Sequence, residues 1–391
     1  MSTRTPVVVA APDSFKGSAT ASDAADAIAR GVLAALPGAE VVRMPMADGG
    51  EGTLDAVLAS WGVQATAVDT VDALDRPRRG RIGFSSDGEQ CIIEAAEANG
   101  LPHVRDVALQ PLRADSFGVG MLARAALDAG VREVLLCIGG SASSDGGSGV
   151  LRALGARLLD SDGRDVPRGA HGLAQVHAID ATQLHRAASA VRWRVAVDVD
   201  NPLVGPRGAA AVFGPQKGAA PEHIAMIDEG LAHFARVVAE ARGTDADELL
   251  AAPGFGAAGG LALALTAIAE VELVAGSQLV ADAVGLADAL DRADLVITGE
   301  GRLDEQSLGG KVVDAVRRMT PRRVPVVVIA GGVELDAERC RREGITAAFS
   351  LSRGASSLEE LIPETLARLS DTAAQVCGLL GSAGASRHVG R

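Results

Sequence analysis

Lysine occurs at three positions in this sequence, and each lysine stands beside a glycine. The 37 basic residues are all arginine except Lys16, Lys217 and Lys311. Lysine is a compact charge on a flexible stem, which suits contact with phosphate inside narrow glycine loops. The pattern therefore favours phosphate chemistry at these positions, with chance retention of the lysines as the alternative.

Glycine-rich loops recur along the chain, directly after segments that predict strands. They cover residues 48–53, 139–149, 299–310 and 331–332. In open α/β sheets ligands bind at the carboxyl ends of the strands, and glycine loops that lead into helices present backbone N–H groups to phosphate. Each loop alone could be a plain tight turn, so the inference rests on their recurrence.

Carboxylates occur in or beside the same loops. The candidates are Asp13, Asp48, Glu51, Asp145, Asp198, Asp200, Glu300 and Asp304. Crowded carboxylates repel one another unless a cation lies among them, so Mg²⁺ with phosphate is a natural partner. Capping of helix N-termini is the alternative, and we expect it to account for about half of them. Lysine, glycine loop, carboxylate and magnesium together indicate phosphoryl transfer.

Two common nucleotide motifs are incomplete here. Lys311 follows glycine, but Glu305 stands where a Walker A loop needs its first glycine, and Val312 stands where that loop needs Ser or Thr. A GxGxxG pattern is present at 254–259, but the preceding residues 245–253 predict a helix rather than a strand. Neither motif by itself establishes a nucleotide site.

The composition of the 391-residue chain bounds its class. Hydrophobic residues make up 48% and charged residues 22%, as in ordinary globular proteins, and the length allows two or three domains. Aromatic residues make up only 2% and the net charge is −13. Base-stacking platforms and a basic surface are therefore scarce, which disfavours nucleic-acid binding.

The sequence also gives no sign of export or membrane insertion. The four cysteines form no CxxC pair, so neither a zinc site nor a disulfide framework is expected. The apolar run 7–11 is too short for a signal sequence, and Pro253 and several glycines interrupt the uncharged stretch 249–269. We expect a cytoplasmic protein with no membrane partner.

Apolar periodicity divides the chain into strands and helices that would position these loops. Strands are predicted at 7–11, 41–46, 294–298 and 324–330, and helices at 53–60, 310–319 and after a cap at Ser22. Strand and helix alternate, which predicts a parallel sheet. Short alternating segments such as 79–84 and 90–94 predict a different sheet, so we expect a second domain inserted into the first.

These motifs, taken in order, resemble the bacterial glycerate kinase type 1 family. The segments that carry the resemblance are 11–18, 46–53, 139–142, 198–203, 213–219, 256–261 and 298–310. Departures are small: Ser143 and Ser144 stand where the family commonly has Thr and Asn, and Val313 stands where it commonly has Pro. The departures affect local loop geometry rather than the class.

The resemblance implies an ATP- and Mg²⁺-dependent kinase that phosphorylates D-glycerate, usually at the 2-hydroxyl, to give 2-phosphoglycerate and ADP. It also implies two α/β domains with the active cleft between them. One would be Rossmann-like, with a parallel sheet formed from both chain ends, and the other would be inserted, with a mixed sheet. The limits we expect are 1–66 with 290–380, 67–289, and a flexible tail at 381–391.

Individual roles follow as hypotheses. Lys16 and Lys217 would neutralise charge on the phosphoryl group or on the glycerate carboxylate, and Asp198 would be the general base or a metal ligand. The substrate would be bound by Asp13, Ser14, Asp48, Gly49, Gly50 and Glu51. Phosphate and nucleotide would be bound by Gly139, Gly140, Ser141, Gly299, Glu300, Gly301 and Lys311. Magnesium ligands would be Asp48, Asp145 and Asp198.

Two other functions stay open at this point. A nicotinamide-dependent oxidoreductase would use 254–259 as its fingerprint, and a non-catalytic binding protein for small hydroxy acids would keep the loops without turnover. Neither needs three lysines beside glycines. The sequence does not determine the choice between the 2- and 3-hydroxyl, or the oligomeric state, for which a homodimer is one option.

Overall fold

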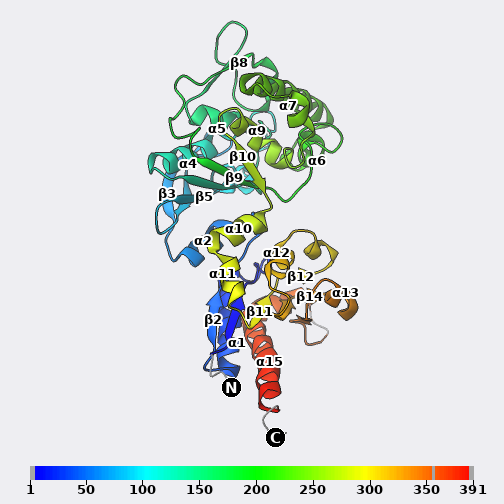
Figure 1. Ribbon diagram of the computed structural model, residues 1–391. Coiled ribbons are helices and arrows are strands. Elements are labelled where there is room, and N and C mark those ends of the chain that lie inside the picture. Colours follow the sequence, from blue (N-terminus) through cyan, green and yellow to red (C-terminus); the bar gives the residue numbers. More distant parts are fainter. Residues whose placement is uncertain (1–4, 355–356, 387–391) are drawn as a thin grey trace. The chain divides into compact units, whose positions relative to one another are not determined.

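The computed structural model describes residues 5–354 and 357–386, which divide into two compact units (Figure 1). The first unit takes in the chain up to Asp48, Asp55–Gly62 and the chain from Ser277 on, and the second takes in Gly49–Leu54 and Val63–Gly276. The domain limits expected near residues 66 and 290 stay a prediction, because compactness does not by itself establish independent folding.

The first unit is built on a five-stranded sheet. In spatial order its strands are β15 (Ala347–Ser350), β13 (Val326–Ala330), β11 (Leu295–Thr298), β1 (Val7–Ala10) and β2 (Glu40–Arg43). Every neighbouring pair is parallel. The predicted parallel sheet from both chain ends is therefore confirmed. From β1 the chain adds β2 on one side and the later strands on the other, so the winding reverses between β1 and β11.

Alternate side chains of β13 face two different layers of helices. Val327 and Ile329 pack in one apolar cluster, and Val328 and Ala330 pack in another. The first cluster includes side chains of α1 (Ala21–Ala35) and α15 (Thr365–Ser386), and the second includes side chains of α12 (Val312–Met319) and α13 (Ala337–Arg342). Helices therefore cover both faces, as continuous apolar strands require.

Two helix ends differ from the sequence predictions. The cap of α1 is Thr20 rather than Ser22, because the Thr20 hydroxyl accepts a hydrogen bond from the N–H of Asp23 at 3.1 Å. At the other end of the chain α15 extends to Ser386, so the tail expected at 381–391 begins within this helix, and its flexibility stays a prediction. A helix anchored by buried Leu369 and Ala373 extends at little cost per residue. Residues 387–391 of the expected tail lie outside the described residues.

The second unit contains a six-stranded mixed sheet. In spatial order its strands are β10 (Val271–Val274), β9 (Arg192–Ala196), β6 (Glu133–Cys137), β5 (Gln90–Glu94), β4 (Pro77–Phe84) and β3 (Thr66–Val71). The two pairs that involve β4 are antiparallel, and the other pairs are parallel. The predicted mixed sheet is therefore confirmed.

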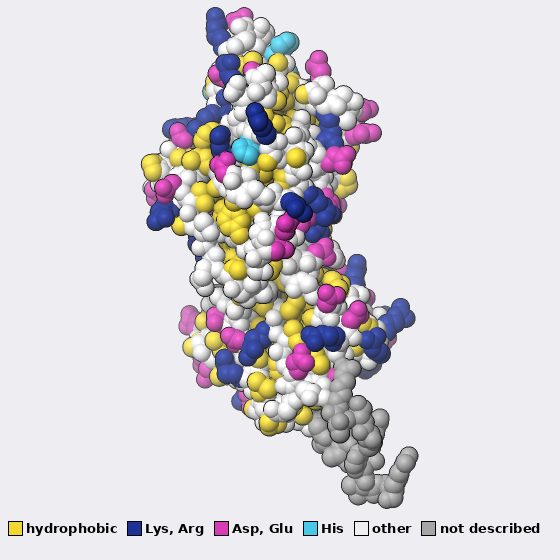
Figure 2. All heavy atoms as spheres, turned by 60° about the vertical axis from the view of Figure 1, so that its left-hand side comes forward, with side chains coloured by type: hydrophobic (Ala, Val, Ile, Leu, Met, Phe, Trp, Pro, Cys, Tyr) yellow, Lys and Arg dark blue, Asp and Glu magenta, His cyan; other side chains and the backbone are white. Residues whose placement is uncertain are grey.

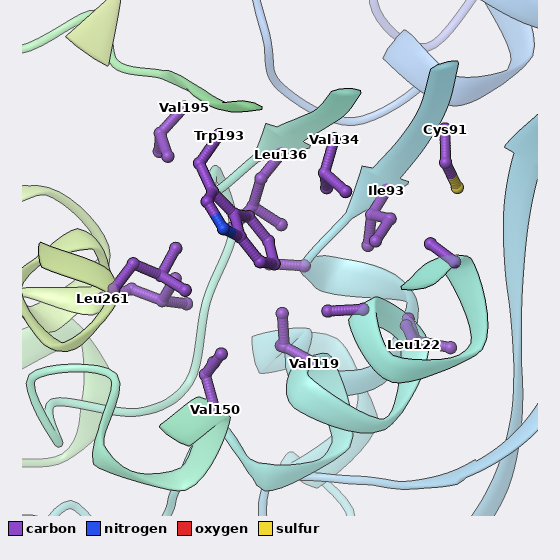
Figure 3. Packing of buried hydrophobic residues seen from close by; sticks show 14 of the residues in the cluster. Cys91, Ile93, Val119, Leu122, Val134, Leu136, Val150, Trp193, Val195 and Leu261 are labelled. Carbon is purple, nitrogen blue, oxygen red and sulfur yellow. The ribbon is translucent and has the colours of Figure 1, made fainter. Parts of the chain in front are cut away.

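Trp193 on β9 is the largest side chain in the core of this sheet. It is fully buried, and its indole lies among side chains of neighbouring strands and of α4 (Phe117–Asp128), as Figure 3 shows. The indole N–H donates to the carbonyl oxygen of Ala188 at 2.8 Å, so its polar atom is satisfied.

The remaining helices join the strands or cover the sheets. They are α2 (Thr53–Trp61), α3 (Ala96–Asn99), α5 (Ser148–Ala153), α6 (Ala209–Phe213), α7 (Pro221–Arg242), α8 (Ala246–Ala251), α9 (Leu261–Thr266), α10 (Gly276–Val284), α11 (Leu286–Asp291) and α14 (Leu358–Leu361). The strands β7 (Arg157–Leu159) and β8 (Ala178–Asp180) form an antiparallel pair. Within the described ranges, no helix has the length and apolar character needed to span a bilayer.

Acidic and basic side chains lie interspersed on the face shown in Figure 2. Exposed arginines commonly pair with carboxylates, as Arg132 pairs with Glu89 at 2.8 Å. Such a mixed surface does not present the continuous positive field that favours binding to a phosphate backbone.

Candidate active site

In the first unit, three carboxylates follow three neighbouring strands of the parallel sheet. Asp13 follows β1, Asp48 follows β2 and Glu300 follows β11. The backbone ties these segments together, since the N–H of Asp13 donates to the carbonyl of Gly299 at 2.8 Å. Carboxyl ends of parallel strands meet at one edge, so the sheet itself gathers these acidic groups.

The surroundings of Asp13 disfavour its charged form. Burial, followed by repulsion from Asp48 and Glu300, raises the pKa of the Asp13 carboxyl to about 7. A hydrogen bond from the backbone N–H of Ser14 and the nearby charge of Lys16 act in the opposite direction. A carboxyl with a pKa near neutrality can both accept and release a proton at working pH.

Glu300 follows Gly299, a position that has no room for any side chain. A Cβ on Gly299 would lie 2.0 Å from the carbonyl oxygen of Ile329, so glycine lets the strands β11 and β13 stay close where they end. Burial raises the pKa of Glu300, and Ser307 and Lys311 lower it in part. Its Oε1 is buried and has no hydrogen-bond partner among the described residues, which leaves an acceptor ready for a ligand.

Lys16 lies on a tight turn and is exposed. The turn is held by reciprocal hydrogen bonds between Phe15 and Ala19, and Phe15 is buried beneath it. In the part of the chain that the structure describes, no hydrogen bond or ion pair holds the Lys16 ammonium group. The ammonium group is therefore free to meet an anion beside the acidic cluster.

Lys217 in the second unit has the opposite environment. It is only 2% exposed, and its Nζ donates to the Ser141 hydroxyl at 3.1 Å and to the Ser143 carbonyl at 2.5 Å. Burial lowers the pKa of Lys217 to about 8, and attraction to Asp145 offsets this shift in part. These hydrogen bonds from the buried lysine stabilise the loop between β6 and α5.

Asp145 is enclosed within the same loop. Its Oδ2 accepts hydrogen bonds from the Ser116 N–H and hydroxyl, the Ser148 hydroxyl and the Gly149 N–H, at 2.8 to 3.3 Å. The side chain is fully buried. These contacts fit the capping alternative, since they join the starts of α4 and α5. The structure thus gives Asp145 a structural environment, and its predicted role as a magnesium ligand stays a prediction.

The remaining predicted residues of the second unit gather near the ends of β6 and β9. Asp198 is exposed, and its Oδ1 accepts from the N–H of Gly276 at 2.8 Å. Gly49 adopts a φ of +86°, and a Cβ there would lie 3.0 Å from the Ala196 Cβ. A Cβ on Gly139 would lie 3.2 Å from the Cα of Gly50. Glycines therefore allow the segment 49–50 to approach these strand ends closely.

Two buried residues that support this region were missed by sequence reasoning. Glu94, at the end of β5, accepts from the N–H of Leu54 at 2.6 Å and so helps to fix the start of α2. Asn99 donates to the Ser143 hydroxyl at 2.8 Å and steadies the loop that Lys217 also contacts. The signal for Glu94 was its position at a strand end, whereas Asn99 lies on a short helix and carried none.

The structure places the predicted residues in two groups. The first unit holds Asp13, Ser14, Lys16, Asp48, Gly299, Glu300, Gly301 and Lys311. The second unit holds Gly49, Gly50, Glu51, Gly139, Gly140, Ser141, Asp145, Asp198 and Lys217. Among the described residues, no set of three or more His, Cys, Asp or Glu side chains could hold a metal ion. Protein carboxylates alone therefore do not build a metal cage here, and Mg²⁺ would need phosphate oxygens and water as further ligands.

A doubly wound sheet with glycine loops, lysine and carboxylates at its carboxyl edge is typical of enzymes that transfer phosphoryl groups to small molecules. The model of the glycerate kinase family matches residues 8–381. This chain therefore belongs to the glycerate kinase family, which confirms the resemblance seen in the sequence.

Individual relatives agree along nearly the whole chain. A glycerate kinase of Bacillus subtilis is 39% identical over 370 residues, which cover 94% of this chain and 96% of the relative. A glycerate 2-kinase of Escherichia coli is 39% identical over 354 residues, covering 90% and 92%. The crystal structure of a protein described as a glycerate kinase 2 of Salmonella typhimurium LT2 superposes with a TM-score of 0.88 at 39% identity, and the match covers 97% of this chain and 100% of that one. These relatives do not support the oxidoreductase alternative.

Proposed function

We propose that this protein is a kinase that transfers the γ-phosphoryl group of ATP to the 2-hydroxyl of D-glycerate, giving 2-phosphoglycerate and ADP. Membership of the glycerate kinase family over residues 8–381 is the observation that carries the proposal. Its relatives include a protein named glycerate 2-kinase, which favours the 2-hydroxyl over the 3-hydroxyl. The acidic cluster beside Lys16 supplies the chemistry that such a transfer needs.

Charge neutralisation is the first task of the site, because ATP and glycerate are both anions and the chain has a net charge of −13. We assign this task to Lys16, whose exposed ammonium group is free of ion pairs with the described residues. Lys311 favours the charged form of Glu300 and would bind a second phosphate. Lys217 would act indirectly, by holding the loop that contains Gly139, Gly140 and Ser141.

Magnesium fits the donors that the chain offers. Bound Mg²⁺ neutralises the charge that develops on the phosphate oxygens of ATP. Asp48 in the first unit is a proposed ligand, and Asp198 in the second unit is the other candidate. Phosphate oxygens and water would complete the coordination of the ion, and the unpartnered Oε1 of Glu300 suits one of those waters. Gly299, Gly301 and Ser14 would contribute backbone groups to the phosphates or the substrate.

Two carboxylates are candidates for accepting the proton of the glycerate hydroxyl. The sequence pointed to Asp198, which is exposed and keeps one oxygen on the N–H of Gly276. We favour Asp13, because the pKa of its carboxyl, about 7, lets it take a proton and then release it near neutral pH. The Asp198 carboxylate and Glu51 would then orient the substrate hydroxyls.

The remaining expectations accompany this proposal. We propose that the reaction takes place in a cleft and that the domain limits are those given above. We also propose that the enzyme is cytoplasmic. The four cysteines are buried and none is joined to another in a disulfide, which suits a reducing compartment.

Phosphorus NMR of purified protein with D-glycerate, ATP and Mg²⁺ tests the function directly. We expect a resonance of 2-phosphoglycerate that depends on Mg²⁺. A resonance of 3-phosphoglycerate would keep the kinase and change the acceptor oxygen. Absence of any phosphoglycerate from a folded sample would refute glycerate as the substrate.

A further inference from the structure

A pocket of about 470 Å³ lies in the first unit, beside the acidic cluster. Its walls come from the segments that follow β1, β11, β13 and β15, together with the residues at the end of α14. This volume lies within the range of about 300 to 1,000 Å³ that is usual for small-molecule sites. The sequence analysis singled out the loops that contribute Lys16, Gly301, Gly331 and Gly332, but not Leu351, Leu361, Ile362 or Thr365.

The position of the pocket is where the topology of the sheet favours a ligand. The winding reverses between β1 and β11, and ligands of doubly wound sheets bind outside the carboxyl ends of the strands at that reversal. Phe15 and Lys16 reach the pocket from the loop after β1, and Gly301 reaches it from the loop after β11. A Cβ on Gly301 would lie 3.9 Å from the Lys16 backbone nitrogen, so the two loops run close together.

The chemistry of the walls is that of a nucleoside site rather than a phosphate site. Phe15, Leu351, Leu361 and Ile362 form apolar walls. The polar side chains of the lining are Lys16, Ser18, Arg302, Glu334 and Thr365, and Arg302 and Glu334 form an ion pair with each other. Apolar walls together with polar groups that can orient a ligand suit a flat base and its sugar. Lys16 lines the same pocket and belongs to the loop of Asp13, so its charge is available to the phosphates that follow the sugar.

We propose that the pocket walled by Phe15, Leu351, Leu361 and Ile362 binds the adenosine part of ATP, with Lys16 beside it for the phosphates. This inference rests on the proposed function and adds a nucleoside subsite to it. In this arrangement Glu300 directly precedes Gly301, which lines the pocket, so the acidic cluster would lie toward the phosphate end of the nucleotide. Residues 361–365 thereby acquire a role in nucleotide affinity.

A second hollow of the first unit serves as the comparison. It measures about 750 Å³ and is lined by several arginines, among them Arg322 and Arg341. Val324 and Val326 also line it, so it lies at the amino end of β13, the edge opposite to Glu300. Arginines there could attract any polyanion, but the hollow does not adjoin the loops of Asp13 and Glu300. Nucleotide bound there would not be positioned for transfer.

Calorimetry with the full-length protein tests the assignment, with MgADP and magnesium triphosphate as the two probes. Leu361→Trp should fill the pocket and raise the Kd for MgADP at least about tenfold, while the Kd for triphosphate changes less than about twofold. Ile362→Asp should have the same effect, and its exposed position keeps the fold safe if the tryptophan variant is unstable. Met226→Trp, an equally bulky change at an exposed apolar position of α7, is the matched control.

Steady-state kinetics separate this inference from the proposed function. We expect Leu361→Trp to raise the KM for ATP and to leave the KM for glycerate unchanged. If both pocket variants phosphorylate glycerate with an unchanged KM for ATP, the inference of a nucleoside pocket is wrong. The proposed function is not affected by that outcome. Loss of MgADP binding in both variants, in a protein that does not phosphorylate glycerate, would support the pocket and refute the function. Loss of MgADP binding only in Arg322→Ala would assign the nucleotide to the arginine hollow and overturn the inference.

Discussion

The acidic edge of the first unit and the glycine loop of the second unit have the same local sequence character but opposite environments. In the first, burial and then the nearby carboxylates raise the pKa of Asp13, and Lys16 stays exposed. In the second, Lys217 and Asp145 are buried, and both side chains form hydrogen bonds with groups of the surrounding loop and helix starts. A charged side chain beside glycines at a strand end can thus be available to a ligand or can stabilise its own loop. Its burial and its hydrogen-bond partners distinguish these two roles.

The largest effect is expected at Asp13. Asp13→Asn keeps the shape of the side chain and removes its capacity to accept a proton, so kcat should fall at least about a thousandfold. A coupled assay of ADP release measures it, with the exposed Asp26→Asn of α1 as the control. If the Asp13→Asn variant has a normal kcat and the Asp198→Asn variant does not, the general base lies in the second unit. The contrast drawn between the two units would then be wrong.

Lys16 should give the next largest effect. If Lys16 neutralises the phosphates as proposed, Lys16→Ala should lower kcat about a hundredfold, with an unchanged melting temperature because no ion pair is lost. The exposed Arg30→Ala in α1 is the matched loss of one positive charge. Normal kinetics in Lys16→Ala would remove this lysine from the active site.

Lys217 should matter for folding more than for chemistry. Lys217→Met leaves the Ser143 carbonyl and the Asp145 carboxylate without a cationic neighbour, so the free energy of unfolding should fall by about 3 kcal/mol. Urea denaturation measures this, and Lys311→Met, at a lysine that is not deeply buried, should change it by less than about 0.5 kcal/mol. An unfolding free energy equal to that of the wild type, together with lost turnover, would instead make Lys217 a catalytic residue.

The pH dependence of stability should report the acidic edge. The pKa of Asp13 lies near 3.8 when unfolded and near 7 when folded. Between these values the folded state binds more protons, so this group's contribution to stability falls as the pH rises. Asp13→Asn should therefore gain at least about 1 kcal/mol over the wild type between pH 5 and pH 8. A constant difference between the two proteins, in unfolding curves at several pH values, would contradict the raised pKa.

The smallest effect is expected at a carboxylate that the sequence also singled out. Asp200 forms an exposed ion pair with Arg207 at 2.9 Å. Such pairs contribute little because water and salt screen them, so Asp200→Asn should shift the melting temperature by less than about 2 °C and leave kcat unchanged. A large loss of turnover would show that Asp200 belongs with Asp13 rather than with the solvated surface.

Local sequence determined the elements and the family of this protein. Continuous apolar runs predicted β1, β11 and β13, because strands buried on both faces need no polar alternation. Glycine loops after these strands carried the family resemblance, because a close approach such as that of Gly299 to Ile329 admits no other residue. These features depend on residues within a few positions of one another, so a single sequence is enough to predict them.

The tertiary structure alone decided the environment of each charge and the shape of the pocket. Asp145 and Asp13 look alike in the sequence, yet one is enclosed by hydrogen bonds from α4 and α5 and the other faces Asp48 and Glu300. The apolar pocket joins Phe15 to Leu361, which are hundreds of residues apart. Desolvation and repulsion depend on which groups meet in space, and only the fold brings those groups together.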